Sequence, residues 1–246
     1  MEYDKTFFVK RRALTLASAE KILDIVWQII QPKTVLDVGC GTGIWLAECK
    51  RKGAERIHGF DGPWVPREEL EIDDEEFLEY DLENMAMDAG QFEMTLCIEL
   101  AEHLSEESGQ KLIVFLTSHA DAILFSAAVP GQGGTGHVNE RPQSYWHKKF
   151  EECGFDCFDL VRPLIWCEGG VNVIYKQNML FYVRRGSAAY YKLEQHENSI
   201  NKVSSCYELD IIHPDLFLLK ANKLKKRKAR NKLSRLWARV SSNNPS

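Results

Sequence analysis

The stretch from Thr34 to Gly43, TVLDVGCGTG, constrains the fold of this chain more than any other feature. The aliphatic and β-branched residues 34–38 predict a short strand, and residues 45–52 predict a helix that Gly53 ends. The glycines between these segments allow a tight turn and leave the helix N-terminus open to an anionic ligand group. A strand that runs through a glycine loop into a helix predicts the first half of a β-α-β unit, which belongs to a parallel sheet.

The alternation of strand-like and helix-like segments predicts how this unit continues. Strands that alternate with helices indicate a parallel sheet covered by helices on both faces. We therefore expect an α/β fold, Rossmann-like and doubly wound, with a mostly parallel seven-stranded sheet. Further strands are predicted at residues 56–61, 77–82, 92–98, 122–129, 157–161 and 179–183, and further helices at residues 13–30, 105–120 and 144–153. The pattern weakens beyond Arg185, so we predict a domain of residues 1–185 and a C-terminal appendage of residues 186–246.

Composition and hydropathy restrict the compartment in which the protein works. The 246 residues are 44% hydrophobic, enough to build the core of one large domain. No apolar run reaches the roughly 18 residues that a membrane-spanning helix needs, and the first residues lack the apolar stretch of a signal peptide. The seven cysteines are scattered without a Cys-x-x-Cys pair, which is typical of free thiols in a reducing compartment. We expect a cytoplasmic protein.

The C-terminal segment is strongly basic although the whole chain has a net charge of −5. Ten Lys and Arg residues follow Leu216 and no Asp or Glu does, so an acidic body carries a basic tail with a predicted helix. Three interpretations stay open: a solvated tail, a peripheral contact with an anionic membrane, or binding to RNA phosphates. The acidic body argues against a large nucleic-acid footprint, so RNA is the less favoured partner.

The order of residues in the glycine loop separates two classes of nucleotide-binding fold. The nicotinamide-binding pattern is G-x-G-x-x-G, whereas Asp37 to Gly43 read D-x-G-x-G-x-G, with an acid before the first glycine. This order closely resembles motif I of the class I S-adenosylmethionine (SAM)-dependent methyltransferases, and the resemblance covers roughly residues 13–185. It implies that SAM is the cofactor. Its binding residues would be Asp37, Gly39, Gly41 and Gly43 at the methionine moiety, Asp61 at the ribose, and Asp81 with Leu82 at the adenine.

A second cluster of polar residues follows the predicted strand at residues 92–98. The stretch CIELAEHL, residues 97–104, contains Glu99, Glu102 and His103, which would share one face if the chain turned helical there. Ligands of doubly wound folds bind at the carboxyl ends of the strands, where this cluster begins. Three interpretations remain: a solvated helix start, His103 as a general base oriented by a carboxylate, or ligands of a divalent metal.

The metal interpretation needs a further ligand, and the glycine-rich loop after the next strand supplies a candidate, His137. The pattern E-x-x-E-H followed by this histidine resembles a subset of these methyltransferases, namely small-RNA terminal 2′-O-methyltransferases and ubiquinone-pathway O-methyltransferases. The resemblance implies Mg²⁺ or Mn²⁺ bound by Glu99, Glu102, His103 and His137. Such an ion would lower the pKa of a bound hydroxyl. The alternative is that His103 or His137 acts as a base without a metal, with Glu102 as a further catalytic residue.

The segment from Val129 to Arg141 indicates which kind of molecule accepts the methyl group. Together with the turn at residues 62–66, it resembles bacterial methyltransferases of glycan and polysaccharide biosynthesis. The resemblance implies O-methylation of a sugar hydroxyl in a glycan or nucleotide-sugar; the alternatives are ribose 2′-O-methylation of RNA and a non-catalytic SAM-binding module. The side chains expected to contact the acceptor are Gln132, Asn139, Tyr145 and Trp146. Tyr145 and Trp146 can equally serve to pack a helix.

Overall fold

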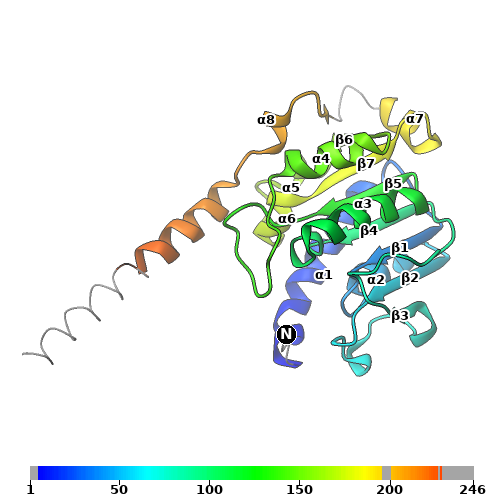
Figure 1. Cartoon of the computed structure of the whole chain (residues 1–246), viewed down its shortest axis with the longest axis horizontal. Coiled ribbons are helices and arrows are strands. Elements are labelled where there is room, and N and C mark those ends of the chain that lie inside the picture. The colour runs from blue at the N-terminus through cyan, green and yellow to red at the C-terminus, as the bar shows by residue number, and fades with distance from the viewer. Residues whose placement is uncertain (1–4, 196–200, 227, 229–246) are drawn as a thin grey trace, which may run out of the picture. The chain divides into compact units, whose positions relative to one another are not determined.

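The computed structural model describes residues 5–195, 201–226 and 228, and it divides into two compact units, Met1–Ile211 and Ile212–Ser246 (Figure 1). The first unit contains a single eight-stranded sheet in the order β3-β2-β1-β4-β5-β7-β6-β8. Its strands are β1 (Thr34–Val38), β2 (Arg56–Asp61), β3 (Phe77–Glu79), β4 (Met94–Ile98), β5 (Ala122–Ser126), β6 (Phe155–Asp159), β7 (Leu180–Arg184) and β8 (Asn201–Lys202).

The pairing of the strands confirms the predicted mostly parallel, doubly wound sheet. Strands β3, β2, β1, β4 and β5 pair in parallel, whereas β7, β6 and β8 pair antiparallel with their neighbours. The sheet has eight strands where seven were expected. The extra strand, β8, is only two residues long and pairs with β6 through Lys202 and Phe158, so its sequence is too short to carry a recognisable period.

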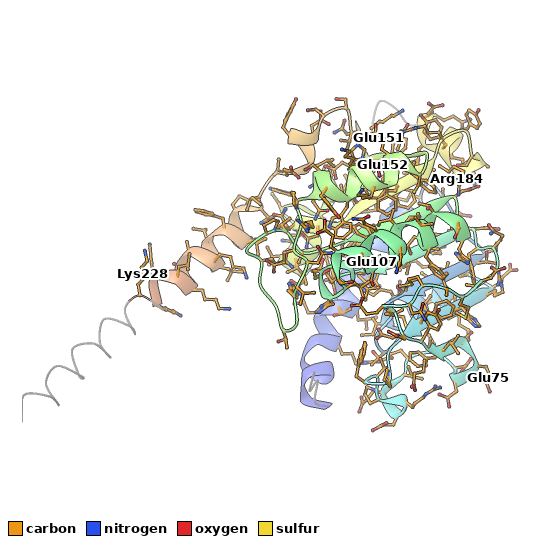
Figure 2. The ribbon with its side chains drawn as sticks, viewed as in Figure 1. Glu75, Glu107, Glu151, Glu152, Arg184 and Lys228 are labelled. Atoms are coloured by element: carbon orange, nitrogen blue, oxygen red, sulfur yellow. The ribbon has the colours of Figure 1, made fainter. Side chains whose placement is uncertain are left out.

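Helices cover both faces of the sheet. Residues of α1 and α2 pack in one hydrophobic cluster with Val35, and residues of α3 and α4 pack in a second cluster with Leu36, because successive side chains of β1 point to opposite faces. Exposed Glu107 on α3 and Glu151 and Glu152 on α4 lie on the outer surface of the helices (Figure 2). The helices are α1 (Lys5–Trp27), α2 (Ile44–Arg51), α3 (Glu106–His119), α4 (Gln143–Glu152), α5 (Arg162–Ile165), α6 (Val173–Asn178), α7 (Ala188–Glu194) and α8 (Cys206–Leu209).

The sequence predicted the long helices and missed the short ones. All four predicted helices are present; the first begins earlier than expected and ends at Trp27, ahead of Pro32. Ser105 caps α3, since its side chain accepts a hydrogen bond from the backbone N–H of Ser108. The helices α5, α6, α7 and α8 have between four and seven residues, which is too short for a hydrophobic period to show.

The residues after the predicted domain boundary at 185 belong in part to the sheet unit. β8 pairs with β6, and the buried side chain of Arg162 donates to the backbone carbonyls of Glu208 and Leu209, each at 3.0 Å. The same guanidinium forms two hydrogen bonds with the Asp159 carboxylate, at 3.0 and 2.9 Å. These contacts extend the compact unit to Ile211.

In the second unit, residues 214–226 are helical and include part of the predicted basic helix. The tail residues from Arg230 onward, including Trp237, lie outside the described residues. No helix within the described ranges is both long enough and apolar enough to cross a membrane. The cysteines with described side chains, all except Cys206, are free thiols.

Candidate active site

The predicted site residues gather at the carboxyl edge of the parallel strands. Asp37 lies next to the end of β1, Asp61 ends β2, and Glu99 directly follows β4. Ser126 ends β5, the neighbour of β4. Since these four strands are parallel and adjacent, their ends bring together side chains that are far apart in sequence.

The loop between β1 and α2 has a backbone that only glycine can adopt without strain. Gly39, Gly41 and Gly43 have φ angles of 83°, 54° and 82°, in the left-handed region. A Cβ atom at Gly39 would lie 3.0 Å from the side chain of Leu100, and one at Gly43 would lie 2.8 Å from Ile72. Both the conformation and the close packing explain the glycines that the sequence singled out.

Asp37 is a buried carboxylate without a partner. Its side chain is 1% exposed, and neither carboxylate oxygen accepts a hydrogen bond among the described residues. Burial, with a smaller contribution from the charge of Asp61, raises the pKa of Asp37 to about 8. A buried acceptor with no donor costs free energy unless a ligand supplies one. The position therefore fits the methionine moiety that the resemblance implies there, because that moiety carries a cationic ammonium group.

Asp61 differs from Asp37 because the protein itself supplies its donors. Its two carboxylate oxygens accept hydrogen bonds from the backbone N–H groups of Gly41 and Gly62, both at 2.7 Å. Burial nevertheless raises the pKa of Asp61, since it outweighs these hydrogen bonds. The carboxylate thus ties β2 to the glycine loop in addition to its expected role at a ribose.

Asp81 and Leu82, expected at the adenine, lie just beyond β3 in different environments. Asp81 is exposed, and its carboxylate accepts a hydrogen bond from the backbone N–H of Glu83 at 3.1 Å. Leu82 is 2% exposed and belongs to the same hydrophobic cluster as Phe60 and Phe92. The side chain of Leu82 therefore packs the core, and only Asp81 presents its side chain to solvent.

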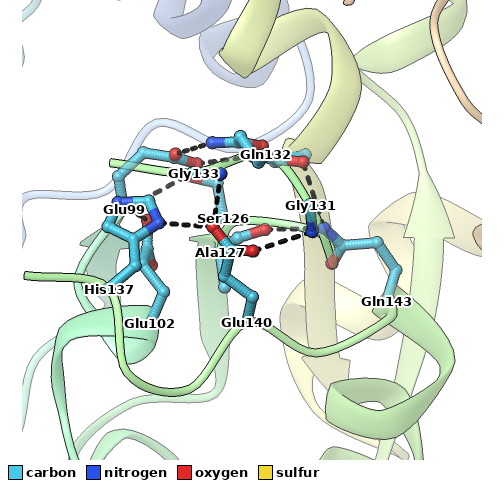
Figure 3. Close-up of polar contacts among 11 residues, drawn as sticks. Glu99, Glu102, Ser126, Ala127, Gly131, Gln132, Gly133, His137, Glu140 and Gln143 are labelled. Carbon is cyan, nitrogen blue, oxygen red and sulfur yellow. Dashed lines mark hydrogen bonds and ion pairs between the residues drawn. The ribbon is translucent and has the colours of Figure 1, made fainter. Parts of the chain in front are cut away.

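Glu99 has an unusual backbone conformation that turns the chain at the end of β4. Its φ is 55°, and no other non-glycine residue within the described ranges has a positive φ. This conformation costs of order 1–3 kcal/mol in a residue with a side chain, so the surroundings must hold it. Two buried amides do so: Gln132 and Asn178 donate to the two carboxylate oxygens at 2.9 and 2.8 Å. Figure 3 shows Gln132 beside Glu99.

Three of the four predicted metal ligands come together. Glu102 and His103 lie in the short 3-10 helix η3 (Ala101–His103), and the loop after β5 brings His137 to them. One potential ligand atom from each residue lies within 4.8 Å of those of the other two. Glu99 is not a member of this cluster; its carboxylate accepts hydrogen bonds from Gln132 and Asn178 and also lies close to the carboxyl group of Glu102. The expected shared face of an α-helix is absent, since the chain forms a 3-10 turn there.

Glu102 is the most buried member of the cluster. Its side chain is completely buried, and neither carboxylate oxygen has a hydrogen-bond partner among the described residues. Burial first, and then the nearby charge of Glu99, raise the pKa of Glu102 well above its usual range. The backbone carbonyl of Glu102 accepts hydrogen bonds from Val138 and Asn139, at 2.9 and 3.0 Å, which fastens the loop carrying His137.

The side chains expected to contact an acceptor occupy different positions. Gln132 and Asn139 are buried, and Asn139 accepts a hydrogen bond from Arg141 at 2.9 Å. Tyr145 is half-buried, and its hydroxyl donates to the exposed Glu106 at 3.2 Å. Trp146 is completely buried, with its ring centroid 5.7 Å from that of Phe125. Trp146 therefore packs the core, and the acceptor role predicted for it is not supported by its position.

Two further groups shape the site, and neither is among the predicted catalytic, metal-binding or cofactor-binding residues. The buried amide of Gln143 donates to the carbonyl of Ala127 at 2.8 Å and to the Oδ1 atom of Asn178 at 3.3 Å, continuing the network around Glu99. Glu140 accepts a hydrogen bond from His137 Nδ1 at 2.8 Å. Burial opposes ionisation of Glu140, but hydrogen bonds from His137, Gly133 and Gly131 outweigh it and lower its pKa. The only sequence signal for Gln143 and Glu140 is that both are polar residues close to a glycine-rich loop.

Comparison with known sequences finds similarity between the first part of the chain and one family of domains. Residues 9–119 match the sequence profile of a family described as a methyltransferase domain. The chain is 29% identical over 122 residues to the ubiquinone biosynthesis O-methyltransferase of Acinetobacter baylyi, a match that covers 46% of this chain and 47% of that protein. The chain thus matches about half the length of its curated relatives.

Solved structures share the fold at low sequence identity. The magnesium protoporphyrin IX methyltransferase of Synechocystis with bound SAM superposes with a TM-score of 0.53 at 19% identity, covering 75% of this chain and 86% of the other. The sugar N-methyltransferase KedS8 from Streptoalloteichus gives a TM-score of 0.57 at 14% identity, covering 75% and 94%. Residues 9–119 therefore resemble a methyltransferase domain, and the sheet has the Rossmann-like fold that these solved methyltransferases share.

Proposed function

We propose that the protein transfers the methyl group of SAM to a sugar hydroxyl of a glycan or nucleotide-sugar, with a divalent cation at Glu102, His103 and His137. The observation that carries the proposal is the cluster of these three side chains beside the carboxyl edge of the sheet. At its centre Glu102 is completely buried, and its carboxylate accepts no hydrogen bond among the described residues.

The residues of the glycine loop fit SAM, which supplies a methyl group on a positively charged sulfur when it is bound. Asp37 offers a buried acceptor that lacks a donor, as an ammonium group requires. The glycines keep side chains away from the loop and allow a ligand to approach the backbone. The loop thus offers both recognition of a cation and space for a cofactor.

The donor set of the second cluster fits a hard or borderline divalent cation. One carboxylate and two imidazoles are ligands that Mn²⁺ accepts, and Mg²⁺ binds the carboxylate with water in the other positions. A cation would also offset the cost of burying Glu102. Because a sugar hydroxyl is a weak nucleophile near neutral pH, a site that methylates it needs a group that removes or polarises its proton, and this cluster can do either.

The comparisons support the class of acceptor only in part. The names of the relatives refer to an O-methyltransferase of ubiquinone biosynthesis and to a sugar N-methyltransferase. The half-buried Tyr145, whose hydroxyl donates to Glu106, suits a hydrogen bond to a sugar hydroxyl. RNA ribose 2′-O-methylation is the second candidate, favoured by the basic residues after Leu216.

One experiment separates these possibilities. The full chain is incubated with methyl-labelled SAM and either nucleotide-sugars, glycan oligosaccharides or short RNA, with EDTA, without EDTA, and with EDTA followed by excess Mn²⁺. We expect label in a carbohydrate, its loss with EDTA and its return with Mn²⁺. Methyl transfer that proceeds equally with and without EDTA would show that the reaction does not need a metal. Label in RNA alone would favour the second candidate, and SAM binding without transfer to any acceptor would favour a non-catalytic module.

A further inference from the structure

We propose that Glu140 is a positioning residue for His137: its carboxylate holds the imidazole in the tautomer with the proton on Nδ1 and leaves the lone pair of Nε2 facing Glu102. The inference deepens the proposed function, in which Nε2 of His137 binds a cation or accepts a proton. The tautomer itself can be observed without an acceptor, a metal or turnover.

The contacts of Glu140 show how it is held. Its Oε2 atom accepts a hydrogen bond from the backbone N–H of Gly131 at 2.8 Å, and its Oε1 atom accepts one from the N–H of Gly133 (Figure 3). Oε1 also lies 2.8 Å from Nδ1 of His137. Both oxygens accept hydrogen bonds from backbone N–H groups, as an ionised carboxylate does. An ionised carboxylate has no proton to donate, so a hydrogen bond between it and His137 requires the proton on Nδ1.

The other side of the imidazole faces the cluster. Nε2 of His137 lies 4.0 Å from Oε1 of Glu102, and the rings of His137 and His103 meet edge to face with centroids 4.8 Å apart. With the proton on Nδ1, Nε2 is the nitrogen that can bind a cation or accept a proton. The hydrogen bond on one side of the ring therefore determines the chemistry on the other side.

Gly134 provides an independent sign that the position of this ring matters. A Cβ atom at Gly134 would lie 2.1 Å from Nε2 of His137 and 2.6 Å from two ring carbons. The glycine is required here by space, since any side chain would collide with the imidazole. The loop thus holds His137 at Nδ1 by a hydrogen bond, and the bare backbone of Gly134 packs against the ring close to Nε2.

The test compares the full chain with the variant Glu140→Gln, using the nitrogen chemical shifts of the His137 ring in ¹⁵N NMR spectra and His137→Gln to assign the signals. We expect the Nδ1–H tautomer in the natural protein. In Glu140→Gln the Nε2–H form should increase, because an amide has one acceptor oxygen where the carboxylate has two. A natural protein with the Nε2–H tautomer, or a variant with unchanged ring shifts, would overturn the proposal.

A kinetic readout separates this inference from the proposed function. We expect Glu140→Gln to lower turnover by about 10- to 100-fold while SAM affinity and the melting temperature stay near those of the natural protein. The control is Glu152→Gln, a half-exposed carboxylate on α4 paired with Lys149, which should change neither the ring shifts nor turnover. A shifted tautomer with unchanged turnover would leave Glu140 as the residue that sets the tautomer and contradict the catalytic role of His137. Lost turnover with unchanged ring shifts would contradict the positioning role.

A different observation supports a second inference, on the second compact unit. The helical residues 214–226 expose Phe217, Leu218, Leu219 and Leu224 by 63%, 54%, 57% and 57%. Between and after these side chains stand lysines, and no acidic residue follows Asp215 in the chain. Binding to phosphates requires cations but does not require exposed leucine and phenylalanine side chains. An anionic membrane surface accounts for both, because it attracts the cations and buries the apolar side chains. We infer that this helix lies on an anionic membrane.

Vesicle sedimentation tests this inference with the full chain. We expect binding to vesicles that contain phosphatidylserine and little binding to pure phosphatidylcholine vesicles. Phe217 and Leu224 lie seven residues apart on one side of the helix, so changing both to serine should reduce binding at least about tenfold. The control Leu164→Ser alters a leucine on α5 that is 60% exposed, and it should not reduce binding. Equal binding to both vesicle types would contradict the membrane inference. Tight binding to short RNA that the double substitution does not change would also contradict it.

Discussion

The Nε2 atom of His137 lies 4.0 Å from the Oε1 atom of Glu102, across the junction of the glycine-rich loop and the 3-10 turn. The backbone of the same two segments is joined by hydrogen bonds from Val138 and Asn139 to the Glu102 carbonyl. The structure thus holds an imidazole against a carboxylate that is completely buried and has no hydrogen bond of its own among the described residues. Such a pair suits a ligand that binds between them.

The substitution Glu102→Gln should separate activity from stability. We expect turnover to fall on the order of 10²-fold or more, because the carboxylate is lost from the cluster. The melting temperature without ligands should rise or stay equal near neutral pH, since burial and Glu99 disfavour the charged form of Glu102 and the amide removes that charge. SAM affinity should stay within about twofold. Turnover, thermal unfolding and calorimetric SAM binding measure the three quantities.

Glu107→Gln is the matched control for that change. Glu107 is an exposed glutamate on α3 that pairs with Lys111, so the substitution should alter neither turnover nor stability noticeably. Unchanged turnover in Glu102→Gln would exclude the carboxylate from the reaction, and a loss of SAM binding would indicate that the variant has damaged the fold.

The affinity for SAM should depend on pH through Asp37. Burial raises the pKa of Asp37 to about 8, so below that pH the free protein holds a neutral carboxyl that must lose its proton to pair with a cation. We expect the SAM dissociation constant to fall as pH rises from 6 to 8, by up to about tenfold per pH unit, and to level off above it. Isothermal titration at several pH values would measure this slope.

Asp37→Asn should abolish the slope and weaken SAM binding. The pKa of Asp37 is higher in the folded than in the unfolded protein, so its ionisation makes the natural protein less stable as pH rises toward about 8. Asp37→Asn removes this effect, so the variant should be the more stable of the two free proteins at the higher pH. Asp74→Asn, at an exposed acid paired with Arg67, should retain the natural slope. A pH-independent dissociation constant in the natural protein would contradict the assignment of Asp37.

The glycine loop should respond to alanine in a graded way. Gly39→Ala and Gly43→Ala combine a positive φ with a Cβ that collides with Leu100 or Ile72, and each should cost about 1–3 kcal/mol in the free energy of unfolding. Gly41→Ala has a positive φ and no atom within 4 Å of the new Cβ, so it should cost less, about 1 kcal/mol. Urea unfolding gives the order, and an equal cost at all three positions would show that packing against Leu100 and Ile72 is unimportant.

Two arginines should differ sharply in their contributions to stability. Arg162→Met leaves Asp159 buried without its partner and should cost about 3–5 kcal/mol. Arg185→Met removes a half-exposed arginine from Asp156, and it should cost less than about 1 kcal/mol because solvent screens that pair. Asp156 also keeps Lys202 as a partner. Urea unfolding measures both, and similar small losses would indicate that Asp159 is well hydrated in the folded protein.

Local chemistry was sufficient to predict the frame of the fold and the glycine loop after β1. The strands β1 and β2 match the predicted residues, because short apolar runs and nearby glycines are signals carried by neighbours in the chain. The glycine loop could be read for the same reason, since a positive φ is a property of a single residue. Glu102 and His103 were found because they are adjacent at the end of a strand.

Packing decided the remaining features, because burial and partners depend on which distant segments meet. Glu99 was expected to be a metal ligand, but its carboxylate accepts hydrogen bonds from Gln132 and from Asn178, which is distant in the chain. Trp146 was expected at the acceptor, but it fills the core beside Phe125. A sequence shows that a carboxylate or an indole is present, but it does not show which groups surround that side chain. The loss of solvent around the side chain determines its role, and it occurs only when the chain folds.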